Sequence, residues 1–567
     1  MTRKGGAAPV KRILSALLAL VLLAALCPTA YAQNDAPAFA VVDVTEMDIP
    51  SLQQAVDDGY LTYEQIMVLY LERIEAYADM YHCLISVSES ALEEARECDR
   101  IYRESGRTSL LFGLPAIIKD NINVAGMATT NGHRYLAGNI ARSDAPVVAG
   151  LKKAGAIIVA KANMDTDANH AQYSISDYGR VNNAFDLNRT SYGSSGGSAV
   201  AAAASLAPIC VGTDTNASIR VPSSGNGVVG IRPTKGLLSA TGVSPLMVTR
   251  DTAGPIAKTV SDTALILSAM DNFEKDYTAT LSTEALSGLR IGVVTNLVNR
   301  CDSEIREIFN NALTVLEAQG ATIVRVSLPL GSVNNVVSEY RRTFVAALNR
   351  NDLDLVIYPT LCSGVLTHSA AFAGSNSNGY FIPPSGGVPA VTVPMGKDKN
   401  GMPSGLEFVG RPYDDALALA AAYDFEQALG LTVRTTLAPS LYDGAPASIH
   451  ELFTLRATSV YQPIIGFEEN YETVRSAYKE AVGYLSGTYY SDADAEQQAQ
   501  TQLDNYADAV TDYEKGCQAQ QLIVDALAQR VADLVHRQQQ LLLLAAVAGV
   551  VILVMVPRLL LKRRSAR

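Results

Sequence analysis

Short apolar runs alternate with segments of helical periodicity along most of the chain. Runs of four to six largely apolar residues suit buried strands, and they occur at 113–118, 156–160, 206–211, 290–294, 322–326, 353–358 and 390–393. Segments with helical spacing fall between them, at 145–154, 198–205, 261–270, 303–319 and 414–429. Helical periodicity over 45–77, interrupted by Asp57-Asp58-Gly59, predicts two helices at the start. The alternation favours one α/β domain over 45–430, a sheet covered by helices on both faces.

The pattern changes near Leu431, where the strand signals end. Apolar and aromatic residues recur at spacings of three and four over 467–485 and again over 503–534. Such spacing predicts long helices, so we expect 431–540 to be a helical, membrane-proximal region. Two interpretations stay open. The region is either a hairpin or coiled-coil stalk, through which the chain could self-associate, or an ordinary helical subdomain packed on the α/β domain.

The first 32 residues have the pattern of an export signal. Basic residues precede an apolar run over 13–26, and Ala30-Tyr31-Ala32 is a small-x-small end, which is typical of a cleavage site. We expect residues 1–32 to be a signal peptide cleaved after Ala32, and the alternative is an uncleaved membrane anchor. A lipid anchor on Cys27 is disfavoured because the bulky Leu26 stands directly before it.

A second apolar segment lies at 541–561. It has 21 residues with one charge, Arg558, and a basic tail over 562–567 follows it. About 20 helical residues cross the ~30 Å hydrocarbon layer, and the basic tail predicts a cytoplasmic C-terminus. The sequence therefore predicts one transmembrane helix in the cell membrane, with the α/β domain outside the cytoplasm. A buried helix of a soluble protein is the alternative.

Charge and cysteine usage narrow the range of partners. The formal net charge is −12 and no long basic stripe is present, which disfavours nucleic acid because phosphate binding depends on clustered Lys and Arg. The seven cysteines are scattered without a CxxC pair, which predicts neither a disulfide scaffold nor a metal site. His133, His170 and His368 each stand alone, so we expect them in surface or core positions and not in a metal cluster.

Three stretches carry candidate chemistry. The apolar run 113–118 leads directly into Lys119. Most lysines are solvated and charged. Burial at the end of a strand lowers the pKa of the amine, as a general base requires. The second stretch, YGSSGGS at 192–198, could be a flexible linker, but a helix-forming run follows it and favours a tight turn. The third, GTDTNASIR at 212–220, contains Ser218 and has no histidine within forty residues on either side.

The second stretch also fits the G-x-S-x-G elbow of α/β-hydrolases, as Gly193-x-Ser195-x-Gly197. In that alternative Ser195 is the nucleophile and works with a later Asp and a histidine such as His368. The elbow must follow a buried strand, and 188–192 does not have the pattern of one. We therefore treat the elbow as the less favoured hypothesis.

Together the three stretches resemble the amidase signature family, serine hydrolases that use a Ser-Ser-Lys triad. The resemblance covers about 45–430 and includes GIRPTKG at 230–236, DTAGP at 251–255 and GVPAVTVPMG at 387–396. The 75 residues from Lys119 to Ser194 and the 24 from Ser194 to Ser218 match the family spacing. The resemblance implies the amidase-signature fold, with a mixed central sheet, and chemistry without a cofactor or metal.

The resemblance also implies the catalytic roles. Ser218 is expected to be the nucleophile that forms an acyl-enzyme. Ser194, held across a cis peptide bond, is expected to pass the proton of Ser218 to Lys119. A second serine and a neutral lysine would thus replace the missing histidine.

Further residues of the same stretches are expected to support this triad. By the resemblance, Ser195 is a supporting hydrogen-bond donor, and Asp214 and Arg220 are structural charges that brace the loop. We expect both charges to be buried and paired, because an unpaired charge would be too costly there. The backbone N–H groups expected to form the oxyanion hole are those of Thr215, Asn216, Ala217 and Ser218.

The chain departs from the family pattern at three places. Asn216-Ala217 stands where the family usually has Gly-Gly, which puts the loop geometry in doubt. Tyr192 replaces a usual glycine and adds an aromatic wall near the nucleophile. The segment between 288 and 358 is shorter than in most members, which place substrate-contacting helices there. The substrate therefore stays open among peptide amides, amino-acid amides, acyl amides and cell-envelope fragments.

The combined prediction is an exported, membrane-anchored amidase that hydrolyses carboxylic amides or esters. Its expected partners are a small-molecule or peptide amide substrate and the membrane. One alternative is a transamidase subunit like the one that amidates glutamyl-tRNA, which export and the missing basic face oppose. The other is a non-catalytic relative that uses the fold for binding or scaffolding.

Overall fold

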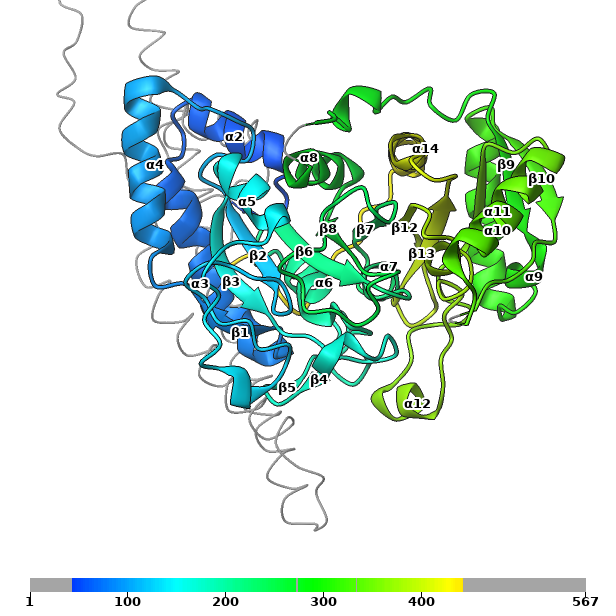
Figure 1. Ribbon diagram of the computed structural model, residues 1–567. Coiled ribbons are helices and arrows are strands. Elements are labelled where there is room, and N and C mark those ends of the chain that lie inside the picture. Colours follow the sequence, from blue (N-terminus) through cyan, green and yellow to red (C-terminus); the bar gives the residue numbers. More distant parts are fainter. Residues whose placement is uncertain (1–42, 272–273, 333, 442–567) are drawn as a thin grey trace, which may run out of the picture.

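The computed structural model describes residues 43–271, 274–332 and 334–441, which form an α/β domain (Figure 1). The expected signal peptide 1–32, residues 442–540 of the expected helical region, the apolar segment 541–561 and the tail 562–567 lie outside these residues. Among the described helices, none combines the length and apolar character needed to cross a membrane. Residues 431–441, where the expected helical region starts, contain no helix.

The domain is built on an 11-stranded sheet with the order β1-β3-β2-β6-β8-β7-β12-β13-β11-β9-β10. β2 is parallel to β3 and β6, and β9 is parallel to β10 and β11, whereas the other neighbours are antiparallel. The expected mixed sheet is therefore confirmed. The strands are β1 Leu84–Val87, β2 Pro115–Lys119, β3 Ile157–Ala162, β6 Ile209–Asp214, β7 Val229–Arg232, β8 Thr252–Ala257, β9 Arg290–Val294, β10 Thr322–Val326, β11 Leu355–Pro359, β12 Ala390–Lys397 and β13 Pro403–Val409, with a separate pair β4 Ile175–Ser176 and β5 Gly179–Arg180.

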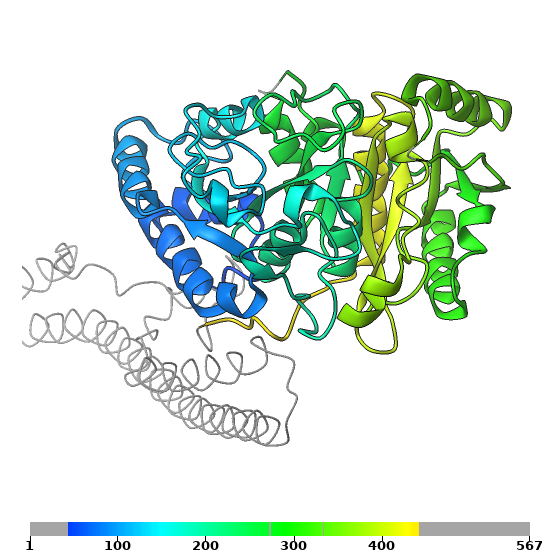
Figure 2. The same ribbon diagram turned by 60° about the horizontal axis from the view of Figure 1, so that its bottom comes forward.

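Helices cover both faces of the sheet. Every residue of β2, β3, β6, β7 and β8 is buried, which requires cover on both sides. In Figure 2 the blue N-terminal helices lie along one end of the sheet, and the green segment with α10 and α11 lies at the other. The helices are α2 Ile49–Asp57, α3 Tyr63–Tyr81, α4 Ala91–Ser105, α5 Pro146–Lys153, α6 Gly196–Ala203, α7 Arg220–Gly225, α8 Val260–Met270, α9 Thr295–Val298, α10 Ser303–Ala318, α11 Val337–Arg350, α12 His368–Ala373, α13 Pro383–Gly386 and α14 Asp415–Leu429.

Local signals set the ends of the first two helices. Asp48 accepts the N–H of Ser51 at the start of α2, at 2.8 Å, and Thr62 with Gln65 forms a capping box at the start of α3. The turn expected near Asp57-Asp58-Gly59 separates the two, with Gly59 at φ 70°. The expected helix pair is therefore confirmed.

The parallel strands bring the candidate stretches to one edge of the sheet. β2 ends at Lys119 and β6 ends at Asp214, and Ile118 pairs with Val211 in register. Because parallel strands point the same way, the segments that follow them meet at the same edge. The loop after β6 carries Ser218, and the turn before α6 carries Ser194. We call this side of the sheet the catalytic edge.

Candidate active site

Lys119 is buried at the end of β2 among three hydroxyl groups. Its Nζ lies 2.7 Å from Ser194 Oγ, 3.0 Å from Ser195 Oγ and 2.8 Å from Thr213 Oγ1. Burial lowers the pKa of Lys119 to about 7, and the charge of Asp165 only partly opposes this, because a low-dielectric environment disfavours the ammonium form. A substantial fraction of this amine is therefore uncharged at neutral pH.

The neighbouring hydrogen bonds orient the uncharged amine. Ser195 Oγ donates to the Thr213 carbonyl oxygen at 3.0 Å and accepts the Thr213 N–H at 3.2 Å, so it can only accept from Lys119. Thr213 Oγ1 already accepts from Asn121 Nδ2 at 3.1 Å. Ser195 Oγ must therefore accept one N–H of a neutral amine, which has two N–H donors and one lone pair. With the second N–H on Thr213 Oγ1, the lone pair faces Ser194 Oγ, and this is the arrangement in which Lys119 can take the proton of Ser194.

Ser194 lies in a tight turn directly before α6. The expected cis peptide bond is present between Gly193 and Ser194. The Ser194 carbonyl oxygen accepts the Asp165 N–H at 3.1 Å and Ser174 Oγ–H at 3.3 Å. A Cβ on Gly193 would lie 2.1 Å from the Tyr173 carbonyl oxygen. Only glycine permits this close approach, which explains one glycine of the Gly-Ser run.

Ser218 lies in the loop between β6 and α7, beside the Ser194 turn. Its carbonyl oxygen accepts the Ser195 N–H at 3.2 Å. All three residues are buried, and Ser218, at 4% exposure, is the least buried, against 0% for Ser194 and Lys119. The Ser218 loop thus contacts the Ser194 turn through the backbone, as a nucleophile served by that serine requires.

The backbone of the same loop offers hydrogen-bond donors. Among the described residues, none accepts a hydrogen bond from the N–H groups of 215–218. The next N–H, of Ile219, already donates to Asp214 Oδ2 at 3.1 Å. The N–H groups expected to form the oxyanion hole are therefore not engaged by another described residue, and stabilisation of a developing negative charge requires such unengaged donors.

Asp214 and Arg220 are buried and paired, as expected. Arg220 Nε lies 3.1 Å from Asp214 Oδ2, and Arg220 Nη2 donates to the Asn216 carbonyl oxygen at 2.8 Å. Arg232 Nη1 lies 2.8 Å from Asp214 Oδ1, and Arg220 Nη1 lies 2.5 Å from Glu407 Oε1. All four side chains are fully buried. Burial alone would raise the pKa of Asp214, but the two arginines lower it to about 2. This network holds the loop backbone in place.

The Asn216-Ala217 departure does not require a glycine conformation. Neither residue has a positive φ, so the replacement of Gly-Gly introduces no left-handed residue. Thr215 Oγ1 donates to Asp251 Oδ1 at 2.6 Å and fixes the start of the loop. The buried Asn216 Oδ1 has no hydrogen-bond partner within the part of the chain that the structure describes.

Tyr192, the other departure, is left-handed at φ 57°, where glycine is the usual residue. Its buried hydroxyl donates to Asn376 Oδ1 at 3.0 Å and accepts the Leu366 N–H at 3.2 Å. Its ring occupies the space beside Gly225, where a Cβ would lie 2.5 Å away. Tyr192 therefore joins the turn before Ser194 to α7 and to residues 366–376.

The elbow hypothesis for Ser195 is wrong. Residues 188–192 form no strand, and Ser195 Oγ donates to the Thr213 carbonyl. His368, the partner named for it, donates from Nε2 to the Leu187 carbonyl at 3.0 Å. Ser195 is instead one of the hydrogen-bond partners of Lys119.

The other two histidines pair with carboxylates. His170 Nδ1 lies 3.0 Å from Asp165 Oδ2, and His133 Nε2 lies 3.0 Å from Asp167 Oδ1. Across the described ranges, no group of three or more His, Cys, Asp or Glu side chains could hold a metal ion.

Five further residues complete the site and received no role from the sequence. They are Thr213, Asp165, Arg232, Asp251 and Glu407. Thr213 stands inside the GTDTNASIR stretch, and Arg232 and Asp251 stand inside the GIRPTKG and DTAGP motifs. Their position inside these motifs was the only sequence signal that could have assigned a role to Thr213, Arg232 and Asp251.

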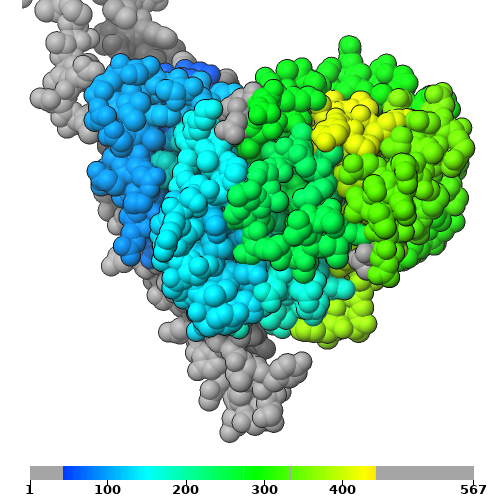
Figure 3. Space-filling model, viewed as in Figure 1, coloured from blue at the N-terminus to red at the C-terminus, as the bar shows by residue number. Residues whose placement is uncertain are grey.

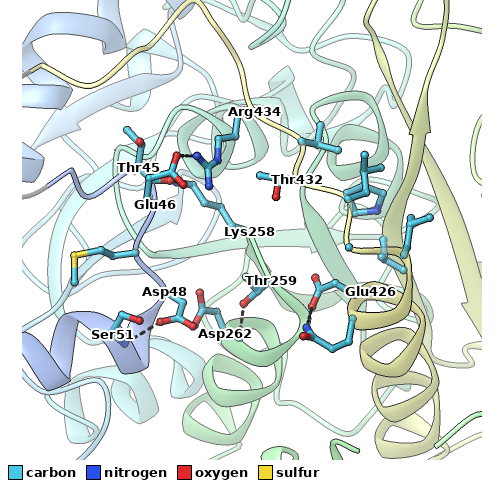
Figure 4. Close-up of a pocket in the computed structure, with 18 residues that line it drawn as sticks. Thr45, Glu46, Asp48, Ser51, Lys258, Thr259, Asp262, Glu426, Thr432 and Arg434 are labelled. Carbon is cyan, nitrogen blue, oxygen red and sulfur yellow. Dashed lines mark hydrogen bonds and ion pairs between the residues drawn. The ribbon is translucent and has the colours of Figure 1, made fainter. Parts of the chain in front are cut away.

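A half-buried lysine, Lys258, lies at the opposite edge of the sheet. β8 is antiparallel to β6, with Thr252 opposite Asp214, so Lys258 at its far end borders a cavity of about 360 Å³ remote from Ser218 (Figure 4). Burial lowers the pKa of Lys258 to about 7 as well. Its Nζ donates to the Thr45 carbonyl oxygen at 2.7 Å, and a carbonyl has no proton to give. A lowered pKa alone therefore does not make a catalytic lysine.

Residues 65–338 match the family model described as Amidase. The chain also resembles a glutamyl-tRNA(Gln) amidotransferase subunit of Halorhodospira halophila, with 36% identity over 293 residues, 50% of this chain and 60% of that protein. The same amidotransferase component of Clostridium botulinum is 36% identical over 302 residues, 51% of this chain and 62% of the relative. The chain thus spans about six-tenths of the length of these curated relatives.

Solved structures share the fold over a longer range. Native peptide amidase from Stenotrophomonas maltophilia superposes with a TM-score of 0.63 at 28% identity, covering 70% of this chain and 99% of that one. The corresponding glutamyl-tRNA(Gln) amidotransferase component from Thermotoga maritima gives a TM-score of 0.58 at 25% identity, with 68% and 95% covered. Residues 65–338 thus belong to a domain of the amidase signature family.

Proposed function

We propose that this chain hydrolyses carboxylic amide C–N bonds, with Ser218 as nucleophile, Ser194 as proton relay and Lys119 as base. The observation that carries the proposal is the 2.7 Å contact between the buried Lys119 Nζ and Ser194 Oγ, with the amine oriented by two other hydroxyls. A solvated or ion-paired lysine would be charged at neutral pH and could not accept a proton.

Acylation follows from this geometry. Ser218 Oγ attacks the amide carbon while its proton passes to Ser194 Oγ, whose own proton passes to Lys119. The negative charge on the amide oxygen is held by N–H groups of 215–218, where one well-placed donor is worth about 2.7–4 kcal/mol. Collapse then breaks the C–N bond, and the proton returns through Ser194 to the leaving nitrogen.

Deacylation uses the same groups with water in place of Ser218. Water loses a proton through Ser194 to Lys119 and attacks the acyl carbon, and the proton then returns to Ser218 as the ester bond breaks. The proposed reaction consumes one water and needs no cofactor.

A small-molecule or peptide amide is the proposed substrate class. The likeness to a peptide amidase over nearly all of that enzyme's chain supports it. Transamidation is a second candidate, which the 36% identity to glutamyl-tRNA(Gln) amidotransferases supports, and it would require a partner protein. Free hydrolysis by the isolated chain distinguishes the two.

We further propose that the domain works outside the cytoplasm, anchored to the cell membrane by one helix. The proposal rests on the export pattern of residues 1–32 and on the apolar segment 541–561 with its basic tail.

Labelling with a fluorophosphonate, which reacts with activated serines, tests the proposed nucleophile. We expect full-length protein to be labelled, Ser218→Ala to lose the label, and Lys119→Ala to be strongly reduced. Ser224→Ala is a matched control, because this buried serine lies on α7 and its Oγ has no partner among the described residues. It should be labelled like the wild type.

Unchanged labelling in Ser218→Ala, or no labelling of folded wild type, contradicts the proposal and favours a binding or scaffolding role. Hydrolysis of a panel of peptide, amino-acid and acyl amides by the same protein then tests the reaction. Turnover only after addition of a partner protein would support transamidation.

A further inference from the structure

A hairpin excursion over 361–380, here called the flap, lies against the candidate active site. Its base is closed by a bridge between Leu361 and Ser377 and by a 2.7 Å hydrogen bond from the Cys362 N–H to the Asn376 carbonyl. The short helix α12 lies at its tip and projects from the lower side of the domain in Figure 1.

Both arms of the flap are fixed to the catalytic stretches. The first arm runs beside the residues that lead to Ser194: the Thr190 N–H donates to the Leu366 carbonyl at 3.0 Å, and the Leu366 N–H donates to the Tyr192 hydroxyl at 3.2 Å. On the second arm, Asn376 accepts from the Tyr192 hydroxyl, and the Gly379 carbonyl accepts from Arg220 at 2.9 Å. The flap is therefore positioned by the same turn and loop that carry the triad.

Helix α12 of the flap places the ring of Phe372 against Tyr173, in the segment that contacts the turn before Ser194. The ring of Phe372, on α12, lies 4.7 Å from that of Tyr173 between centroids, and Tyr173 stacks on His170 at 4.8 Å. Phe372 is 59% exposed, and the His170 side chain is 44% exposed. We call these three rings the aromatic lip. In Figure 3 the yellow-green α12 region abuts the cyan segment at the lower edge.

The segment that carries two rings of the lip contacts the turn before Ser194. The Gly193 N–H donates to the Ala171 carbonyl at 3.0 Å, and the backbone of Tyr173 packs directly on Gly193. His170 and Tyr173 therefore belong to the segment that touches the residue before Ser194. The same turn contacts the Ser218 loop, where the Ser195 N–H donates to the Ser218 carbonyl at 3.2 Å, so one turn of the chain joins the lip to Ser218.

From this arrangement we infer that the aromatic lip binds an aromatic or large apolar group on the acyl side of the substrate. The inference rests on the proposed amidase function. The inference is made for primary amides, whose leaving group is ammonia and carries no substituent, so that in these substrates a side chain that reaches the lip belongs to the acyl part. Partly exposed rings that already contact one another gain contact area and ring–ring interaction when such a group covers them.

Two matched amides test the lip with the full-length protein. N-acetylphenylalanine amide and N-acetylalanine amide share the reacting group and differ only in the side chain. We expect wild type to prefer the phenylalanine amide. Phe372→Ala should lower kcat/KM for that substrate about tenfold, mainly through KM, and change the alanine amide less than twofold. Val336→Ala, an apolar residue 58% exposed at the start of α11, is the control and should leave both unchanged.

Three results would overturn the inference: no preference in wild type, equal losses on both amides, or no loss in either Phe372→Ala or Tyr173→Ala. Turnover of neither amide by protein whose Ser218 is labelled also overturns it, while the nucleophile stands. Absence of both turnover and labelling removes the proposed function itself, and the lip with it.

Discussion

The pKa of Lys119 determines the pH at which Ser218 becomes reactive. Burial lowers this pKa, and the nearby charges of Asp165, Asp214 and Asp251 raise it again. Because the amine works as a base only when uncharged, the rate should rise as the pH rises through the pKa of Lys119. The carboxylates around the site thus determine where this acid limb lies.

Asp165→Asn should move the acid limb to lower pH. The amide has the shape of the carboxylate but lacks the negative charge that favours the ammonium form, so the pKa of Lys119 falls and more neutral amine is present in acid. Initial rates of amide hydrolysis between about pH 5 and 9 measure the limb. Asp167→Asn is the control, since its side chain is 59% exposed and it is not among the charges that act on Lys119. An unmoved or upward-moved limb in Asp165→Asn would contradict the assignment.

At the scale of elements, the turn before Ser194 contacts helix α7 where the ring of Tyr192 packs against Gly225. Tyr192 adopts the left-handed conformation with its ring beside Gly225 on α7. The pair links the residue that relays the proton to the helix that follows the nucleophile. Its packing therefore affects both serines.

Gly225→Ala should lower the thermal denaturation temperature, because its Cβ would lie 2.5 Å from the Tyr192 ring. Overpacking of this kind costs about 1–3 kcal/mol. Tyr192→Gly removes the ring and suits the positive φ, so the double variant should lose less than the sum of the single losses. Thermal unfolding of wild type, both single variants and the double variant measures the coupling. Additive losses would show that the two residues do not interact.

The elements that the sequence predicted best are those with strong local patterns. The buried strand that leads to Lys119 and the helices 303–318 and 415–429 agree with their predicted ranges within two residues. Strands β7, β8 and β13 were not predicted, because glycine and proline interrupt their apolar pattern. In β8 the glycine is required by packing, since a Cβ on Gly254 would lie 2.2 Å from the Ile231 carbonyl. That contact depends on the assembled sheet and has no local signature.

The site residues divide in the same way, into those that the sequence suggested and those that only the folded structure brings to the site. Family resemblance suggested Lys119, Ser194 and Ser218, and the fold brings their segments together at one edge. Glu407, which completes the network around Arg220, comes from 187 residues further along the chain. A single sequence shows no reason to connect the two, because the contact arises only when α7 packs on β13.

For the whole molecule, the proposed C-terminal anchor would hold the domain on the outer side of a membrane. We expect full-length protein to sediment with membranes, and a variant that ends at Gln540 to be released as an exported protein with the same amide hydrolysis. The reason is that 541–561 is long and apolar enough to span the bilayer. Fractionation with activity assays checks this. Retention of the truncated protein in the membrane would point to an uncleaved N-terminal anchor instead.

The central claim is that a neutral, buried Lys119 activates Ser218 through Ser194. The pH dependence of the fluorophosphonate labelling rate tests it most directly, because labelling reports the reactivity of Ser218 without a choice of substrate. We predict that the rate rises with a midpoint at about pH 7, the pKa of Lys119, and that Lys258→Met, at the lysine beside the remote cavity, keeps this profile. Lys119→Met should lose it. A rate that does not depend on pH, or a Lys119→Met variant with the wild-type profile, would contradict the claim.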